Sequence, residues 1–508
     1  MKPAAATYAG KQHNARTLAL HVLGICRQHA AFLQEILDEQ LTRHALSPAD
    51  RRLTTQLTYG VLRRRGTLHA LLAPLVARPA ANVEPWLWDA LYLGACQLAL
   101  MNNIPVHAAI NETVELAAAF GRPGAKGFLN GVLRGLAGLV TDERMSTPGP
   151  DALPLEKGEY RRLLRPVLPD LATQPVEYLA AGFGLPHWLA SRWTARYDEA
   201  ECRRLGFWFA GPGPLTLRCN ALQTDREMLL QAFRDAEIEA DAGEHPQSVR
   251  LRDLVPIRDL PRYDEGWFTV QDEASMRVAA ALAPEPGMNV LDLCAAPGGK
   301  TTHLAELMQN QGRIVACDVD DRRLKTVSSL AERLRLTIIE TRRLTATGEV
   351  GEPAGAFDAV LVDVPCSNTG VLGRRPEVRW RLRPDDLTRL VTLQVRLLRL
   401  AARCVRPGGT VVYSTCSSEP EENQEVVRRV GRLLKLETEE IAEPGKPGDG
   451  GYWARLRRTD EDVPMDVDQT IRPRGTADVL ASGPAPRRHP GNRRRHTGDV
   501  RERRTPPG

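Results

Sequence analysis

The sequence lacks several features that would place the protein in common classes. Its nine cysteines include no Cys-x-x-Cys pair, so neither a zinc site nor a disulfide framework is predicted, and a reduced cytoplasmic compartment is expected. No run of roughly 18 uncharged apolar residues is present, which excludes a membrane-spanning helix. Residues 1–12 contain no apolar core of the kind that a signal peptide needs.

The chain also lacks a strong excess of charge of either sign. Lys and Arg number 68 and Asp and Glu number 63, which gives a net charge of +5. Charge alone therefore does not predict a nucleic-acid partner. Arginines nevertheless occur in runs, at 63–65, 374–375, 457–458 and 493–495. Arginine suits phosphate recognition, but a solvated arginine-rich surface explains each run at least as well.

The spacing of apolar residues changes along the chain and divides it into parts. Over residues 13–142 they recur at intervals of three and four, which predicts an all-α bundle. Residues 143–200 are predicted to form a linker with helices. Short alternating runs over 201–270, with Asp225 as the N-cap of one helix, predict a small α+β module.

The last third of the chain predicts a doubly wound α/β domain over residues 271–458, because short apolar runs alternate with helical patterns. Strands are expected at 289–293, 313–318, 336–341, 359–363 and 410–413, with a terminal pair near 434–441 and 452–456. From 459 to 508 periodicity is lost and Pro, Arg and Gly dominate, which predicts a disordered basic tail.

A glycine-containing turn follows the first expected strand of this domain. Residues 289–301 read Asn-Val-Leu-Asp-Leu-Cys-Ala-Ala-Pro-Gly-Gly-Lys-Thr, without the spacing of a dinucleotide or triphosphate loop. Asp318 ends the second expected strand, twenty positions after Gly298, where a carboxylate can accept both ribose hydroxyls of a nucleoside. A nucleoside cofactor without a pyrophosphate indicates S-adenosylmethionine. The alternative is a structural turn followed by a surface aspartate.

Two cysteines follow two other expected strands. Cys366 lies in Asp-Val-Pro-Cys-Ser-Asn-Thr-Gly (363–370), and Cys416 lies in Tyr-Ser-Thr-Cys-Ser (413–417). The carboxyl ends of parallel strands share one crevice, and a thiolate is a strong nucleophile at neutral pH. Two thiols beside Asp363 therefore indicate covalent catalysis. Spacing alone does not decide which thiol is the nucleophile.

These motifs together resemble the RsmB/Fmu-type RNA cytosine-5 methyltransferases. The resemblance rests on the order of 294–301, 363–367 and 414–417, supported by 374–380, 420–423 and 448–450. In the first part of the chain, residues 104–112 and 125–134 are similar to the NusB-like RNA-binding domain that is fused to RsmB. The resemblance covers residues 13–458 and leaves only the tail outside it.

The resemblance implies a class I, Rossmann-like catalytic domain that uses S-adenosylmethionine to methylate cytosine C5 in RNA. Its nucleophile would be Cys416, with Cys366 helping to release the product, and Asp363 would bind the base. The RNA would be 16S (small-subunit) rRNA, and the protein would be a monomer without metal or membrane contact. The cofactor would be held by Cys294, Ala295, Ala296, Pro297, Gly298, Gly299, Lys300, Asp318, Arg323 and Asp363.

The chemistry explains why such residues are needed. Cytosine C5 is a weak nucleophile toward the methyl group of the cofactor, but addition of a thiolate to C6 places electron density on C5. Lys300 is a candidate for lowering the pKa of Cys416, and Asp363 for hydrogen bonding at N3 and N4 of the base. The target base must leave any helix to reach the site. Three nearby residues could contact phosphate or stack a base: Arg374, Arg375 and Trp380. For Trp380, a structural role is equally open.

The sequence departs from the family pattern in several places. No aspartate follows the third strand, where residues 340–343 read Glu-Thr-Arg-Arg, and Glu340 is the candidate substitute. Asn368 stands where glycine or alanine is common, and Gly373 resembles an inserted residue. His107 and Asn111 are expected to fix a turn and a cap.

Rival functions compete with the one that the family implies. An amine methyltransferase would carry Asn/Asp-Pro-Pro-Tyr/Phe, which Asp-Val-Pro-Cys does not match. A non-catalytic NusB-like RNA-binding or assembly factor is a second rival, and a methyltransferase that acts on another RNA such as tRNA is a third. Both thiols, Asp363 and the glycine turn argue against a non-catalytic factor.

Overall fold

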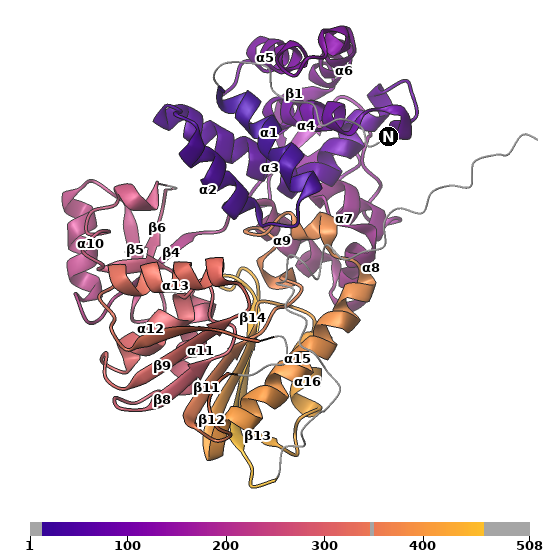
Figure 1. Ribbon diagram of the computed structural model, residues 1–508. Coiled ribbons are helices and arrows are strands. Elements are labelled where there is room, and N and C mark those ends of the chain that lie inside the picture. The colour runs from indigo at the N-terminus through magenta and orange to yellow at the C-terminus, as the bar shows by residue number, and fades with distance from the viewer. Residues whose placement is uncertain (1–12, 254, 346–349, 462–508) are drawn as a thin grey trace, which may run out of the picture.

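The computed structural model describes residues 13–253, 255–345 and 350–461, which form three connected parts (Figure 1). A helical part lies at the top of the view, a small sheet with one helix lies at the left, and a larger sheet flanked by helices lies below them. This confirms the predicted fold class. All but the first three residues of the expected tail lie outside the described residues.

The helical part is organised around one fully buried helix. Every residue from Trp86 to Ala99 in α4 is buried, as expected for a helix that is apolar on all sides. Its single acidic residue, Asp89, forms an ion pair with Arg27 at 3.0 Å. The helices are α1 (Ala15–Gln28), α2 (Leu33–Arg43), α3 (Pro48–Leu72), α4 (Pro85–Leu100), α5 (Val106–Ala119) and α6 (Lys126–Ala137), with short 3-10 turns η1 (Ala73–Leu75), η2 (Ala80–Asn82) and η3 (Pro123–Ala125).

A small antiparallel sheet occupies part of the segment that the sequence suggests is a linker. Its strands are β1 (Val140–Met145), β2 (Ala152–Pro154) and β3 (Tyr160–Leu163), in the order β1-β3-β2. Strand β3 is difficult to predict from the sequence because it contains an arginine, Arg161, that is buried. The Arg161 guanidinium donates to the carbonyl of Ala99, near the end of α4, at 3.0 Å. Helices α7 (Pro175–Phe183), α8 (His187–Arg196) and α9 (Glu199–Ala210) follow.

The small α+β part contains a four-stranded antiparallel sheet in the order β5-β6-β4-β7. Asp225 caps its helix as predicted, because its carboxylate accepts a hydrogen bond from the amide of Met228 at 2.8 Å. The elements are β4 (Leu215–Cys219), α10 (Arg226–Asp235), β5 (Ala240–Ala242), β6 (Ser248–Leu251), η4 (Ile257–Asp259) and β7 (Phe268–Val270).

The larger sheet has seven strands in the order β10-β9-β8-β11-β12-β14-β13, in which β14 is antiparallel to both of its neighbours and the other pairs are parallel. Leu291 and Val290 belong to hydrophobic clusters on opposite faces of the sheet: the cluster of Leu291 includes Leu398 of α15 (Pro384–Cys404), and that of Val290 includes Leu282 of α11 (Glu273–Leu282). The strands are β8 (Asn289–Asp292), β9 (Arg313–Asp318), β10 (Ile339–Arg343), β11 (Phe357–Asp363), β12 (Val405–Thr415), β13 (Leu434–Ala442) and β14 (Gly451–Arg458).

Helices cover both faces of this sheet. In Figure 1, α11, α12 and α13 lie on one side, and α15 and α16 lie on the other. Because β8 pairs with β9 on one side and with β11 on the other, a crevice forms at the carboxyl end of β8. The helices are α11 (Glu273–Leu282), α12 (Gly299–Leu307), α13 (Asp321–Arg333), α14 (Val378–Arg381), α15 (Pro384–Cys404) and α16 (Gln424–Arg428), with η5 (Thr369–Val371) and η6 (Pro420–Glu422).

A buried ion pair joins the small α+β part to the larger sheet domain. Arg218 on β4 contacts Glu306 on α12 at 2.6 Å, and their side chains are 0% and 1% exposed. The same guanidinium donates to the carbonyl of Gly299 at 2.7 Å. Arg218 therefore holds the first turn of α12, where the glycine-containing turn ends.

Removing one member of this pair is expected to destabilise the protein strongly. Arg218→Met leaves Glu306 buried without its partner, so the free energy of unfolding should fall by about 3–5 kcal/mol. The matched control is Arg252→Met, which breaks an exposed pair with Asp241 and should change the free energy of unfolding far less, because solvent screens exposed charges. Urea unfolding curves measure both, and equal losses would contradict the prediction.

Candidate active site

The predicted site residues meet at the carboxyl edge of the parallel strands. Two cavities of about 300 and 260 Å³ open there. Both are lined by Cys294, Ala296, Pro297, Asp363 and Cys416. One cavity extends toward the end of β9, and the other toward β14 and the start of α11. The glycine turn, the aspartate and the second cysteine thus border a shared space.

The two cysteines face each other across this edge. Their Sγ atoms are 3.2 Å apart. Cys366 is buried at 3% exposure, and Cys416 is half-buried. The hydrogen bond with Cys416, burial and the nearby Cys416 charge raise the pKa of Cys366 well above its usual value. The two thiols are therefore unequal: Cys366 is the more deeply buried and is held in its protonated form.

Asp363 lies beside the thiols as half of an ion pair. Its Oδ2 is 2.7 Å from Nζ of Lys300, and its Oδ1 accepts a hydrogen bond from the Ser414 hydroxyl at 2.7 Å. Burial lowers the pKa of Lys300, but the Asp363 carboxylate outweighs burial, with a further contribution from Cys416, and the net effect is a raised pKa. Lys300 is thus a stable cation within electrostatic reach of Cys416.

Asn368 is a neighbour of the thiols whose role the sequence does not reveal. Its Oδ1 accepts a hydrogen bond from the Cys416 thiol at 3.2 Å, and its amide nitrogen donates to the Cys366 carbonyl at 2.9 Å. The residue adopts a left-handed backbone conformation, with φ of 59°, which asparagine tolerates better than most residues. Its side chain therefore touches both cysteine loops.

A buried glutamate fastens the two cysteine loops together. Glu422 accepts hydrogen bonds from the Ser367 amide at 2.9 Å and from the Ser417 hydroxyl at 2.5 Å. Burial raises its pKa. Residues 420–423 are recognised in the sequence only as part of a family motif. This role of Glu422 is not predicted, because a carboxylate that binds neighbouring amide and hydroxyl groups has no recognisable sequence pattern.

The other end of the first cavity has the features of a nucleoside site. Asp318 and Arg323 both line it and form an ion pair at 3.2 Å. Burial raises the pKa of Asp318. Gly298 has φ of +107°, and a Cβ there would lie 3.1 Å from Cα of Val327, so only glycine allows the turn to lie this close to α13.

Glu340 is not the substitute for the missing aspartate. Strand β10 runs to Arg343, two residues beyond the expected end at 341, so Glu340 is the second residue of the strand and lies three residues before its carboxyl end. It pairs with Arg313 at 2.8 Å and with Arg342, and it lines neither cavity. Leu344, the first residue after β10, lines the first cavity instead. Residues 346–349 lie outside the described residues.

Arg374 and Arg375 line the first cavity, and the segment after Cys366 also makes contacts inside the molecule. Arg374 pairs with Asp449 and donates to the Pro214 carbonyl at 2.8 Å. Trp380 donates to the Leu62 carbonyl at 2.8 Å, which supports a structural role for Trp380. Arg379, which lies in the matching stretch 374–380 but has no role assigned from the sequence, is 2% exposed.

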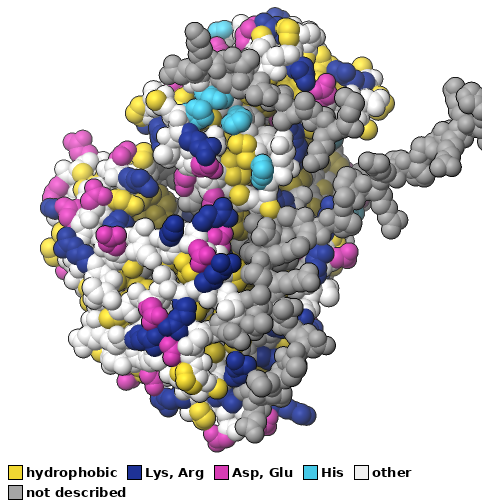
Figure 2. Space-filling view, viewed as in Figure 1, with side chains coloured by type: hydrophobic (Ala, Val, Ile, Leu, Met, Phe, Trp, Pro, Cys, Tyr) yellow, Lys and Arg dark blue, Asp and Glu magenta, His cyan; other side chains and the backbone are white. Residues whose placement is uncertain are grey.

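The expectation for His107 and Asn111 in the helical part is tested by the position of α5. His107 and Asn111 are exposed on α5, and no side chain caps that helix, whose N-cap is Pro105. The expected capping role is therefore wrong. The view in Figure 2 shows Lys and Arg side chains spread over the molecule among Asp and Glu side chains. On this face, charge does not mark one path for a polyanion.

Metal-binding clusters and membrane spans are absent from the part of the chain that the structure describes. Among residues 13–253, 255–345 and 350–461, no cluster of three or more His, Cys, Asp or Glu side chains could hold a metal ion. Within the same ranges, no helix is long and apolar enough to cross a membrane.

Three family models match the chain. The 16S rRNA methyltransferase RsmB/F family matches residues 279–446, the NusB family matches 13–138, and the RsmF/B-like ferredoxin-like domain matches 185–258. The crystal structure of PH0851 resembles the chain with a TM-score of 0.70 at 24% identity, over 89% of this chain and 100% of that one. This likeness shows the fold.

Several curated relatives are similar over most of their length. Probable ribosomal RNA small subunit methyltransferase B of Synechocystis sp. is 37% identical, over 82% of this chain and 88% of the relative. The protein of the same description in Bacillus subtilis is 35% identical with the same coverage. Ribosomal RNA small subunit methyltransferase B of Salmonella enteritidis is 32% identical, over 88% of this chain and 99% of the relative.

Proposed function

Because the chain belongs to the RsmB/F family of 16S rRNA methyltransferases, we propose that it methylates C5 of a cytosine in small-subunit rRNA through a covalent bond from Cys416 to C6. The observation that carries this proposal is the pair of Sγ atoms 3.2 Å apart beside the Lys300–Asp363 ion pair. A methyltransferase that acts on an exocyclic amine needs neither thiol. Two thiols of unequal burial suit a reaction with separate addition and release steps.

S-adenosylmethionine is the proposed cofactor, and the first cavity fits it. The Asp318 carboxylate lies where ribose hydroxyls would donate to it, and the small residues Ala296 and Pro297 leave room beside it. Val319 and Leu344 offer apolar surfaces for a base. The cofactor supplies an electrophilic methyl group on a sulfonium sulfur. Asp363 and Cys416 line the same cavity, so the target base and the methyl group would meet next to the nucleophile.

Cys416 begins the proposed reaction. Its thiolate bonds to C6 of the cytosine, the C5–C6 double bond is broken, and its electron pair makes C5 nucleophilic toward the methyl group. Asp363 accepts a hydrogen bond from the N4 amino group of the base and, when N3 is protonated, a second one from N3, with Lys300 holding the carboxylate in place. Positioned proton acceptors of this kind contribute about 10²–10⁴-fold to rates.

Cys366 completes the reaction once C5 carries the methyl group. The C5 proton must be removed, and its electron pair re-forms the double bond as the Cys416 sulfur leaves C6. Two of the three largest causes that raise the pKa of Cys366 are its hydrogen bond to Cys416 and the Cys416 charge. Both disappear when Cys416 is bonded to carbon as a neutral thioether. Cys366 therefore becomes easier to ionise at the stage when a base is needed.

The proposal is tested directly with unmodified 16S rRNA. Incubation with the protein and S-adenosylmethionine should yield 5-methylcytidine at one position, detected by nucleoside mass spectrometry and located by bisulfite sequencing. The Cys416→Ala protein is the matched control and should give none. Methylation confined to tRNA, or methylation of an amine, would refute the proposed substrate or reaction.

The inequality of the thiols predicts how each should react with iodoacetamide. A raised pKa means a smaller thiolate fraction at a given pH, so Cys366 should be labelled only at strongly alkaline pH. In the Cys416→Ala protein the pKa of Cys366 should fall, and labelling should begin at lower pH. Peptide mass spectrometry across the pH range measures both onsets.

Cys294 provides an internal control for this labelling series. Burial and the neighbouring Asp318 and Asp292 carboxylates raise its pKa, and Cys416 is not among the causes. Its labelling should therefore not change in the Cys416→Ala protein. An unchanged onset for Cys366 would show that burial alone governs that thiol.

A further inference from the structure

One short segment runs from the proposed nucleophile into the helical part. Residues 368–381 are here called the bridging segment. At its start, Asn368 contacts the Cys416 thiol at 3.2 Å, and the amide of Gly370 donates to the Cys416 carbonyl at 3.0 Å. The position of Cys416 therefore depends on where this segment lies.

The middle of the bridging segment is held by α3. The Arg63 Nε donates to the carbonyl of Gly373 at 2.7 Å. A Cβ at Gly373 would lie 2.7 Å from the carbonyl oxygen of Gly211, so the segment passes directly against the end of α9. Arg375 then lies over the ring of Phe32 at 4.3 Å. The residue that resembles an insertion in the sequence therefore lies in a close main-chain contact, where a side chain would not fit.

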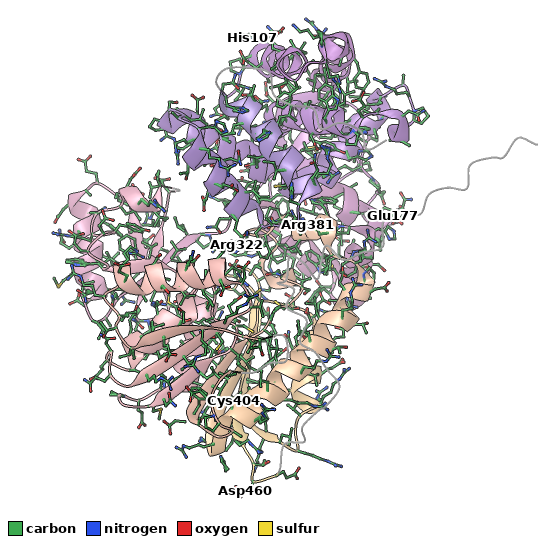
Figure 3. All side chains as sticks on the ribbon, in the orientation of Figure 1. His107, Glu177, Arg322, Arg381, Cys404 and Asp460 are labelled. Carbon is green, nitrogen blue, oxygen red and sulfur yellow. The ribbon has the colours of Figure 1, made fainter. Side chains whose placement is uncertain are left out.

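The end of the bridging segment is α14, whose side chains enter the helical part. Arg379 donates to the carbonyls of Arg63 and Phe183, both at 2.9 Å, and to that of Phe209. Arg381 donates to the carbonyl of Ala30 at 2.7 Å. Figure 3 shows Arg381 at the junction between the helical part and the rest of the molecule.

The environment of Arg379 favours one position of α14 relative to the helices that it contacts. Burial lowers the pKa of its guanidinium to about 9, and a buried charge is costly unless its hydrogen bonds are satisfied. Phe183 and Phe209 lie at the carboxyl ends of α7 and α9, where carbonyl oxygens carry partial negative charge. A shift of α14 would leave the guanidinium buried without these acceptors.

We propose that the helical part positions Cys416 for attack on the base through the bridging segment, with Arg63 and Arg379 as positioning residues. The inference rests on the proposed function of Cys416 and extends it, because it gives the helical part a role in the chemical step apart from any contact with RNA. Displacing a reacting group by about 1 Å can cost roughly 10²-fold in rate.

Two adjacent arginines of α3 provide a matched test. Arg64 is buried and Arg63 is half-buried, and desolvation lowers the pKa of each to about 10. Arg63 holds Gly373, whereas Arg64 donates to the carbonyls of Pro154 and Gly182 within the first half of the chain. Only Arg63 therefore reaches the bridging segment with its side chain.

The Arg63→Met protein should show a fall in kcat of about tenfold or more with saturating 16S rRNA, while KM for the RNA changes less than about twofold. Arg63→Lys, which keeps a donor, should recover part of kcat. Arg64→Met should lower the midpoint of thermal unfolding but keep kcat within about twofold of wild type. If Arg64→Met does not fold, Arg64→Lys replaces it. Equal falls in kcat for the two positions, or a change in KM alone, would overturn the proposal.

A second readout does not depend on methylation. The rate at which iodoacetamide modifies Cys416, followed by peptide mass spectrometry, should rise severalfold in the Arg63→Met protein and stay at the wild-type value in the Arg64→Met protein. If wild type makes no 5-methylcytidine, the proposed function fails while this comparison still decides whether the segment positions Cys416. An unchanged rate in the Arg63→Met protein would overturn the positioning role.

Discussion

Replacing Cys366 with alanine is expected to leave the protein covalently bonded to its RNA. Addition of Cys416 to C6 and methylation of C5 should still occur, but removal of the C5 proton should slow by about 10²–10⁴-fold, the usual contribution of a positioned base. A protein–RNA complex that survives denaturing electrophoresis should therefore accumulate during incubation with 16S rRNA and S-adenosylmethionine.

Two companion variants make this experiment decisive. Replacing Cys416 as well should abolish the complex, since the bond to C6 can no longer form. Cys404→Ala is the matched control, because Cys404 is buried at the far end of α15 (Figure 3) and lines neither cavity. A complex that persists without Cys416 and disappears without Cys366 would reverse the roles of the two thiols.

The Asp363→Asn protein is expected to lose about 10³-fold in kcat. The amide cannot accept hydrogen bonds at both positions, and it leaves the Lys300 cation without its carboxylate partner. Loss of the acceptor should slow addition of Cys416, so the Cys366→Ala/Asp363→Asn protein should form little covalent complex. Single-turnover methylation and the yield of complex measure the two effects.

Ser414→Ala is the control for this prediction. It removes the hydrogen bond to Oδ1 of Asp363 but keeps the carboxylate and its pairing with Lys300. We expect kcat to fall by less than about tenfold. If the double variant accumulates as much covalent complex as Cys366→Ala alone, Asp363 does not act in the addition step.

Much of the fold follows from local patterns in the sequence. The buried parallel strands are predictable because each is a short apolar run that ends at an aspartate: Asp292, Asp318 or Asp363. Strand β3 is not, because Arg161 looks like a surface residue until its carbonyl partners on α4 are known. A buried guanidinium gives the same pattern as an exposed one, since the difference lies in contacts remote in sequence.

The site divides in the same way. Cys366, Cys416 and Asp363 could be found because each directly follows a strand whose carboxyl end forms the crevice. Glu422 and Arg379 lie inside matching stretches, but their roles could not be found, because each acts on main-chain groups or hydroxyls that any sequence supplies. Glu340 was a reasonable candidate because it stood next to the expected end of the third strand, but the strand runs two residues further, and Leu344 lines the cavity instead.

The anchoring of Arg379 by main-chain oxygens also bears on how this family can diverge. An arginine that pairs with a carboxylate requires a matching change when its partner is replaced. Carbonyl oxygens remain when the side chains of Arg63, Phe183 and Phe209 change. The helical part can therefore accumulate substitutions without loosening its hold on α14. Comparisons of covarying positions among homologues should accordingly miss this junction, even where it is retained.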